Sequence, residues 1–287
     1  MTLAALEFTR PPADLSIEPQ IRDALQEDIG RAGDITSALT IPADQAAEAR
    51  LVARKSGAIA GLIAAKIAFR LVDPSLAFVV AAPDGSKVEP GALIASVSGP
   101  ARAILTAERV VLNFAGHLSG VATATAALVD AVKGTKARIV CTRKTLPNLR
   151  ILQKYAVRCG GGFNHRFGLD DAALIKDNHI AAAGGIAPVL ERVRAGLGHM
   201  TKIEIEVDTL AQLEEALSLG ADTILLDNMT PENLRRAVTL AKGRAVLEAS
   251  GNVALATVRE IAETGVDYIS SGAITHSAIN LDIGLDF

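Results

Sequence analysis

The segment from residue 138 to residue 169 is strongly cationic, although the whole chain carries a formal net charge of −3. The segment contains seven Arg or Lys residues and no Asp or Glu. They are Arg138, Arg143, Lys144, Arg150, Lys154, Arg158 and Arg166, with His165 beside the last. Guanidinium and ammonium groups bind phosphate and carboxylate oxygens, so the segment predicts a site for a small polyanion.

Within this segment, Arg143 and Lys144 are the strongest candidates because they closely follow a short apolar run. Barrel enzymes place reacting groups at such strand ends. The three cations between residues 150 and 158 recur every fourth residue, which fits the solvated face of a helix equally well. The glycines at 160–162 precede His165 and could form a backbone nest for an anion or a merely flexible loop.

Lys176 closes another apolar run, Leu174-Ile175, and its side chain is therefore expected to be buried. A buried ammonium group is costly unless an anion compensates it, so we expect Lys176 to contact substrate. A Schiff-base lysine, as in an aldolase built on a barrel, is the alternative.

Two carboxylates, Glu206 and Asp227, follow successive apolar runs and are expected to point into one mouth. Paired carboxylates in a basic site favour binding of Mg²⁺ or of ribose hydroxyl groups. Each could instead cap a helix or pair with Arg143 or Lys176.

Two loops of small residues follow the last two apolar runs of the chain. Their backbone amides could approach a phosphate closely, and a phosphate site after the last two strands is recurrent in barrels. The loops are Ser250-Gly251-Asn252 and Ser271-Gly272-Ala273.

The histidines and cysteines do not indicate a structural metal site or a disulfide framework. None of the five histidines shows zinc-type spacing. The two cysteines, Cys141 and Cys159, lie in one segment and suit a reducing compartment.

The elements that position these residues alternate between apolar runs and amphipathic helices beyond residue 136. Runs beginning near 139, 174, 203, 224, 245 and 268 predict buried parallel strands, and glycines at 220, 243 and 265 end the helices between the later ones. A doubly wound sheet and an α/β barrel both fit, but polar residues at the strand ends favour the barrel. Roughly 150 residues are too few for the ~250 of a complete barrel, so we expect an open one.

The first part of the chain has a mixed pattern, with helices expected over 15–30 and 62–72 and strands over 50–54 and 93–97. Residues 101–132 predict helix, with Gly116 and Gly120 as its break. We therefore expect a mixed α/β domain over residues 1–117 and an open TIM-like α/β barrel over residues 118–275. The tail, 276–287, is expected to pack back on the first domain.

Composition excludes several classes of protein. The chain has 287 residues, which predicts two domains or one large barrel, and with 49% hydrophobic and 21% charged residues it has ample apolar material for a core. The net charge excludes a globally basic nucleic-acid-binding protein. The first residues lack the pattern of a signal peptide, and no apolar run approaches the ~18 residues of a membrane span. We expect a cytoplasmic protein without nucleic-acid or membrane partners.

Taken together, the motifs closely resemble the quinolinate phosphoribosyltransferase family. They are Thr142-Arg143-Lys144-Thr145, Lys154-Tyr155-Ala156-Val157, Asn164-His165-Arg166 after the three glycines, and residues 174–179, 225–229 and 248–252. Residues 27–30, 33–37 and 108–113 look like the family's first-domain segments. The resemblance covers nearly the whole chain, and the order and spacing of the motifs are specific.

The resemblance implies transfer of the phosphoribosyl group of 5-phosphoribosyl 1-diphosphate to quinolinate. Decarboxylation would give nicotinate mononucleotide, CO₂ and diphosphate in de novo NAD biosynthesis. It also implies Mg²⁺ as cofactor and a homodimer with shared active sites, which could assemble further.

The resemblance also implies roles for individual residues. It assigns the quinolinate carboxylates to Arg143, His165 and Arg166, beside Thr142, and to Arg109 of the partner subunit. The implied catalytic residues are Lys144, Lys176, Glu206 and Asp227, of which the two carboxylates would bind ribose and Mg²⁺, directly or through substrate or water. The loops at 250–252 and 271–273 would hold the 5′-phosphate.

Two departures from the family pattern lie beside the implied pocket. Leu146-Pro147-Asn148 stands where the family usually has Thr-Pro-Gly, and Gln153 stands where Glu is common. They bear on substrate affinity more than on the type of reaction. A non-catalytic anion-binding or transport-associated paralogue is the remaining alternative, and retention of the full cationic and acidic set argues against it.

Overall fold

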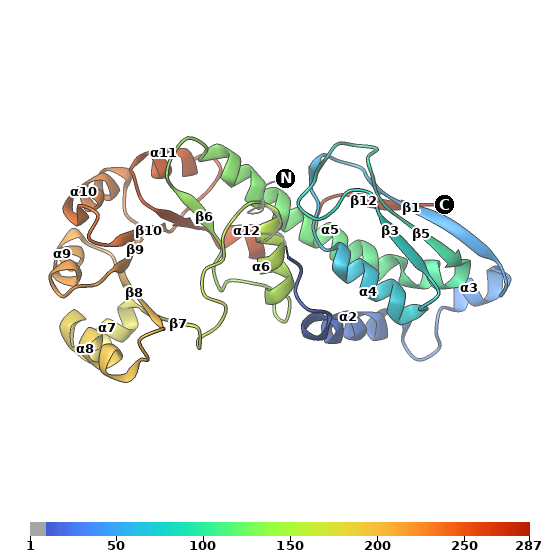
Figure 1. Ribbon diagram of the computed structural model, residues 1–287, viewed down its shortest axis with the longest axis horizontal. Coiled ribbons are helices and arrows are strands. Elements are labelled where there is room, and N and C mark those ends of the chain that lie inside the picture. Colours follow the sequence, from blue (N-terminus) through green and yellow to red (C-terminus); the bar gives the residue numbers. More distant parts are fainter. Residues whose placement is uncertain (1–9) are drawn as a thin grey trace. The chain divides into compact units, whose positions relative to one another are not determined.

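The computed structural model describes residues 10–287, and the chain divides into two compact units. The first comprises residues up to Ala126, Thr145–Gly161 and Ile274–Phe287. The second comprises Ala127–Lys144 and Gly162–Ala273. The chain therefore passes between the units several times, and helix α5 (Ala101–Ala131) contains the boundary expected at residue 117. Figure 1 labels the elements.

The first unit is built on a four-stranded antiparallel sheet. Its order is β12 (Ile283–Asp286), β1 (Ala46–Ala53), β5 (Leu93–Pro100) and β3 (Ala77–Val80). Strand β12 comes from the C-terminal tail and pairs with β1, placing Leu51 opposite Leu285. A separate two-stranded sheet joins β2 (Gly57–Ala58) and β4 (Lys87–Val88). The strands expected near residues 50 and 93 are thus present.

The helices of the first unit follow the apolar spacing of the sequence. Helix α2 (Asp14–Ile29) buries Ile17, Ile21 and Leu25, which recur every fourth residue and so share one face. The other helices are α3 (Ile35–Thr40), α4 (Leu62–Val72), α5, α6 (Arg150–Cys159) and the short α12 (Ala273–His276), which begins at the last residue of the second unit. Among the described helices, only α5 is long and apolar enough to span a membrane, and it is largely buried inside the protein.

The expected break of α5 at its glycines was wrong, because the helix is continuous. Its glycines instead allow the C-terminal segment to approach closely. A Cβ atom at Gly120 would lie 2.2 Å from the Ile279 carbonyl oxygen, and one at Gly116 would lie 3.1 Å from that of Leu281. The Leu281 amide donates to the Gly116 carbonyl at 2.9 Å, which joins this segment to the helix.

The second unit is an open α/β barrel with a six-stranded parallel sheet. The order is β6 (Arg138–Val140), β11 (Tyr268–Ser270), β10 (Val246–Ser250), β9 (Thr223–Asp227), β8 (Lys202–Val207) and β7 (Ala172–Ile175). The predicted strands are confirmed. Because β6 and β7 are the two edges of the sheet, the barrel is incomplete.

Helices α8 to α11 lie along one side of this sheet (Figure 1). The second-unit helices are α7 (Asp177–Ala183), α8 (Ile186–Gly196), α9 (Leu210–Ser218), α10 (Pro231–Ala241) and α11 (Val258–Glu263). Helix α10 begins as its sequence predicts, because the Thr230 hydroxyl accepts from the Asn233 amide and Pro231 occupies the first helical position. These short helices connect parallel strands, so that the carboxyl ends of all six strands lie at the same edge of the sheet.

We predict that Gly120→Ala destabilises the protein by about 1–3 kcal/mol, because the added methyl group must displace the backbone at Ile279. Denaturant unfolding measures the change. Gly196→Ala is the matched control, since a Cβ atom there meets nothing within 4 Å. Equal stability of the two variants would show that the close approach to α5 is unimportant.

Candidate active site

The carboxyl ends of the parallel strands bring together most of the residues predicted to do chemistry. Strand β6 leads to Arg143 and Lys144, and β7 leads directly to Lys176. Glu206 lies near the end of β8, and Asp227 is the last residue of β9. The edge therefore carries both cations and carboxylates, as predicted.

Lys176 forms an ion pair with Glu206, with Nζ 2.5 Å from Oε2. The Lys176 side chain is 46% exposed, so its predicted burial was wrong; it lies one residue beyond β7, where the chain turns into α7. The Glu206 side chain is only 10% exposed. This ion pair is one of the alternatives expected for Glu206.

Beyond Asp227, two loops interlock through residues with left-handed backbone conformations. Asn228 has φ 53° and its amide donates to the Ser250 carbonyl at 2.9 Å. Gly251 has φ 93°, and a Cβ atom there would lie 2.1 Å from Asn228 Oδ1. Asn252 Nδ2 also donates to Asn228 Oδ1, at 3.3 Å. The sequence motifs contain Asn228, but its role in holding the predicted phosphate loop is visible only in the structure.

The second predicted phosphate loop begins with a residue that is hydrogen-bonded to the sheet. The buried Ser271 donates its amide to the Val140 carbonyl at 3.0 Å, as a continuation of the pairing between β11 and β6. Its amide is therefore occupied, and the loop's capacity to hold phosphate depends on the residues after Ser271.

His165, a predicted site residue, lies beside two buried carboxyl groups, Glu204 and Glu248, to which the sequence analysis gave no role. His165 Nε2 lies 2.8 Å from Glu204 Oε2 and 3.8 Å from Glu248 Oε1. The side chains are 14%, 10% and 7% exposed, respectively. Glu204 is two residues before Glu206, so both project from the same face of β8 at different depths. That alternation is the sequence signal that identifies Glu204.

The hydrogen bonds of His165 define its tautomer. The Arg166 amide donates to His165 Nδ1 at 2.8 Å, so Nδ1 is unprotonated and Nε2 carries the proton that Glu204 accepts. Both ring nitrogens therefore have protein partners, and hydrogen bonding to a substrate carboxylate would require exchange of one of them. A protonated Nε2 is also unable to ligate a metal ion, so this trio does not fit a divalent cation.

Electrostatic shifts at this site have identifiable causes. Burial, followed by repulsion from Glu204, raises the pKa of Glu248 to about 7 from its usual 4.5, although His165 opposes the shift. Burial and then the nearby Arg143 lower the pKa of Arg166, while Asp171 and Glu204 act in the opposite direction. Arg166 Nη1 also donates to the Ala172 carbonyl at 2.9 Å. The site thus contains two neighbouring guanidinium groups and two buried carboxyl groups, those of Glu204 and Glu248.

Several other predicted residues lie in the first unit. Lys154 is fully buried in α6, so a solvated face was the wrong interpretation for that residue. Arg150 Nε donates to the Thr145 hydroxyl at 3.1 Å. Arg109 is exposed on α5. None of these three belongs to the second unit that carries the strand ends.

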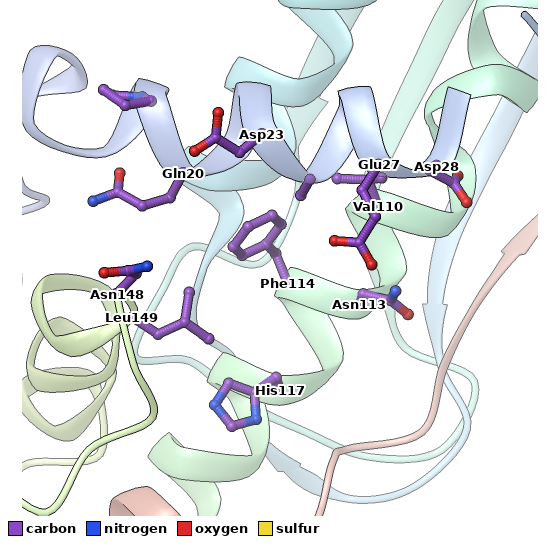
Figure 2. Close-up of a pocket in the computed structure, with 12 residues that line it drawn as sticks. Gln20, Asp23, Glu27, Asp28, Val110, Asn113, Phe114, His117, Asn148 and Leu149 are labelled. Atoms are coloured by element: carbon purple, nitrogen blue, oxygen red, sulfur yellow. The ribbon is translucent and has the colours of Figure 1, made fainter. Parts of the chain in front are cut away.

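The first unit also contains a cavity of about 720 Å³, shown in Figure 2. Asp23, Glu27 and Asp28 from α2 line it, together with His117 from α5 and Asn148 before α6. Three carboxylates make this cavity a poor site for a polyanion. The barrel edge, where cations and carboxylates gather, is the better candidate.

Gln153, one of the two departures from the family pattern, has a structural explanation. Its Nε2 donates to His117 Nε2 at 2.8 Å and to the Thr275 carbonyl at 2.9 Å, while its Oε1 accepts from the Leu146 amide at 2.9 Å. A glutamate offers no donors for the first two bonds when ionised. Burial lowers the pKa of His117, which keeps its ring able to accept.

Comparison with known proteins finds relatives that match most of the chain. The Quinolinate phosphoribosyl transferase C-terminal domain matches residues 121–286, and the N-terminal domain of the same family matches residues 34–119. A carboxylating nicotinate-nucleotide pyrophosphorylase from Mycobacterium leprae is 47% identical, with 93% of this chain and 95% of the relative covered. Quinolinate phosphoribosyltransferase 1b, a decarboxylating enzyme of Nicotiana tabacum, is 45% identical over 96% of this chain and 84% of its own.

Among solved structures, NadC from Streptococcus pyogenes superposes with a TM-score of 0.93 at 40% identity. The match covers 97% of this chain and 98% of that one. The likeness therefore extends over both compact units.

We predict that Glu248→Gln removes a pH-dependent loss of stability. A carboxyl whose pKa is raised in the folded state stabilises it below about pH 4.5, and that contribution disappears as the pH rises through about 7. Between pH 5 and pH 8.5, the wild type should lose up to about 3 kcal/mol relative to the variant. Urea unfolding at both pH values measures this, with the exposed Glu191→Gln as control. Parallel pH profiles for the wild type and Glu248→Gln would contradict it.

Proposed function

The chain belongs to the quinolinate phosphoribosyltransferase family and is a pentosyltransferase of NAD biosynthesis. From that premise, we propose that the barrel edge transfers the phosphoribosyl group of 5-phosphoribosyl 1-diphosphate to quinolinate. The observation that carries this proposal is the convergence of cations with Glu206 and Asp227 at one set of strand ends. An acceptor with two carboxylates and a donor with a diphosphate both need such cations, while the ribose needs acceptors for its hydroxyl groups.

The quinolinate carboxylates are assigned to the guanidinium groups of Arg143 and Arg166, beside Thr142. Burial, followed by the neighbouring Arg143, lowers the pKa of Arg166, and an anion bound between the two guanidinium groups would offset their repulsion. Lys144 lies between the two substrates together with Lys176, whose present partner is Glu206. Arg109 lies in the first unit and is assigned to the neighbouring subunit's site within a cytoplasmic homodimer.

Glu206 and Asp227 are assigned to the ribose hydroxyls and to Mg²⁺. Hard carboxylate oxygens suit Mg²⁺, which usually keeps several waters and binds one or two carboxylates plus phosphate oxygens. Lys176 pairs with Glu206 Oε2, and Asn228 Nδ2 donates to Asp227 Oδ2 at 2.6 Å, so each carboxylate retains one further oxygen for these ligands. Bound Mg²⁺ would supply charge stabilisation to the leaving diphosphate.

The proposed chemistry requires no nucleophilic side chain. The pyridine nitrogen forms a bond to ribose C1 as the bond from C1 to the diphosphate oxygen breaks, and positive charge develops on the sugar. Glu206 and Asp227 stabilise that charge, and the lysines stabilise the departing diphosphate. The bond between pyridinium C2 and its carboxylate then breaks, releasing CO₂. The electron pair left on C2 is stabilised by the adjacent cationic nitrogen and takes a proton from solvent.

The experiment is an assay with quinolinate, 5-phosphoribosyl 1-diphosphate and Mg²⁺, in which CO₂ and diphosphate appear in equal amounts.

Arg143→Ala should weaken quinolinate binding by about 1.5–3 kcal/mol, since a charge-assisted pair is lost. Isothermal titration measures the affinity, and Arg192→Ala on the exposed side of α8 is the control. Wild-type affinity in Arg143→Ala would show that the carboxylate site is misassigned.

Shared active sites predict complementation between two inactive variants. Mixing Arg109→Ala with Lys176→Ala should restore part of the activity, because one site of the heterodimer receives Arg109 from one chain and Lys176 from the other. Mass spectrometry verifies that subunits exchange. Exchange without regained activity would place Arg109 in its own subunit's site or outside any site.

A further inference from the structure

A short loop connects the two edge strands of the open barrel. At its start, the Phe163 amide donates to the Ile139 carbonyl of β6 at 2.8 Å, and the Phe163 carbonyl accepts from the Cys141 amide at 3.1 Å. At its end, strand β7 begins at Ala172. The loop between them, residues 164–171, contains Arg166, so its conformation determines where that guanidinium group lies.

The carboxylate of Asp171 holds the turn that follows Arg166. Its Oδ2 accepts from the Phe167 amide at 2.7 Å, and its Oδ1 accepts from the Gly168 amide at 2.9 Å. The next residue, Ala172, accepts from Arg166 Nη1 through its carbonyl at 2.9 Å. Three hydrogen bonds thus join residues 166–168 to residues 171–172, and Asp171 accepts two of them.

Apolar packing contributes little to this turn. The Leu169 side chain is 73% exposed and that of Phe167 is 43% exposed, so the burial of these residues stabilises the loop only in part. Arg166 Nε is buried and has no hydrogen-bond partner within residues 10–287, which makes the position of this side chain costly. The two charge-assisted hydrogen bonds of Asp171 offset these costs.

We propose that Asp171 is a positioning residue for quinolinate, because its carboxylate fixes the turn after Arg166 and so holds the Arg166 guanidinium where it binds a substrate carboxylate. This inference rests on the proposed function of the barrel edge. A side chain that is already held in place loses less conformational entropy when the substrate binds, so the turn increases affinity. Asp171 needs no contact with the substrate for this role.

The charge of Asp171 acts in the opposite direction from its hydrogen bonds. Burial and then Arg143 lower the pKa of Arg166, and Asp171 is the first of the acids that oppose this shift, so its carboxylate acts on the guanidinium electrostatically. A negative charge near the site also repels the substrate carboxylates. Removal of Asp171 should therefore strengthen quinolinate binding if only its charge matters, and weaken binding if the turn matters.

Asp171→Ala and Asp170→Ala form a matched pair of variants. Each removes one acid from the same loop, but the exposed Asp170 carboxylate accepts no hydrogen bond from the part of the chain that the structure describes. We expect Asp171→Ala to weaken quinolinate binding roughly tenfold in isothermal titration and to raise the KM for quinolinate similarly. Its kcat and its KM for phosphoribosyl diphosphate should stay within about twofold of wild type.

The comparison variants limit the interpretation. Asp171→Asn keeps one accepting oxygen, so its affinity for quinolinate should lie between those of wild type and Asp171→Ala. Asp170→Ala should bind quinolinate as tightly as wild type or more tightly. Unchanged or tighter binding in Asp171→Ala would overturn the proposal.

A double variant tests whether Asp171 acts through Arg166. In an Arg166→Ala background the turn has no guanidinium group to position, so the further change Asp171→Ala should alter quinolinate affinity by less than about twofold. A further loss of roughly tenfold would show that Asp171 acts by another route and would overturn the positioning role.

Hydrogen exchange followed by mass spectrometry provides a measurement without substrate. The peptide that contains the Phe167 and Gly168 amides should exchange faster in Asp171→Ala than in wild type or Asp170→Ala, because these amides lose their acceptor. Equal exchange in the three proteins would contradict the proposal. Failure of the proposed function would instead appear as wild-type protein that neither binds quinolinate nor forms CO₂ and diphosphate.

Discussion

The two-residue alternation of side chains along β8 is the constraint on which the barrel site depends. Glu204 and Glu206 face the same side of the sheet at two depths, because successive side chains of a strand point to opposite faces. The deeper carboxylate anchors an imidazole, and the shallower one pairs with a lysine from the neighbouring strand end. A shift of β8 by one residue would remove both carboxylates from the site, so the register with β7 and β9 defines its chemistry.

Much of this arrangement could be predicted from the sequence. Apolar runs ending in charged residues indicated both the strands and the edge at which Arg143, Lys176 and Asp227 gather. These signals are local, because they depend on the period of a single element. The roles of Glu204 and Glu248 are not local. Each lies inside a strand, and its significance depends on His165, which approaches from a loop far along the chain.

The glycines of α5 illustrate the same limit. Within one element, Gly116 and Gly120 indicate weak helical propensity and hence a break. In the folded protein their missing side chains admit the backbone near Ile279 and Leu281, more than 150 residues later in the sequence. The predicted burial of Lys176 was wrong for a related reason. The apolar run before this lysine does not show that the chain leaves the sheet at that residue.

The three hydrogen bonds of Gln153 have an evolutionary consequence. An isolated change to glutamate would turn a carboxylate oxygen toward the Thr275 carbonyl and toward a ring nitrogen of His117 that now accepts. His117 would have to change tautomer, and Thr275 would need a new donor. Glutamine and glutamate at this position therefore belong to two alternative networks. Lineages that pass from one to the other are expected to substitute these positions together, which would appear as covariation across an alignment.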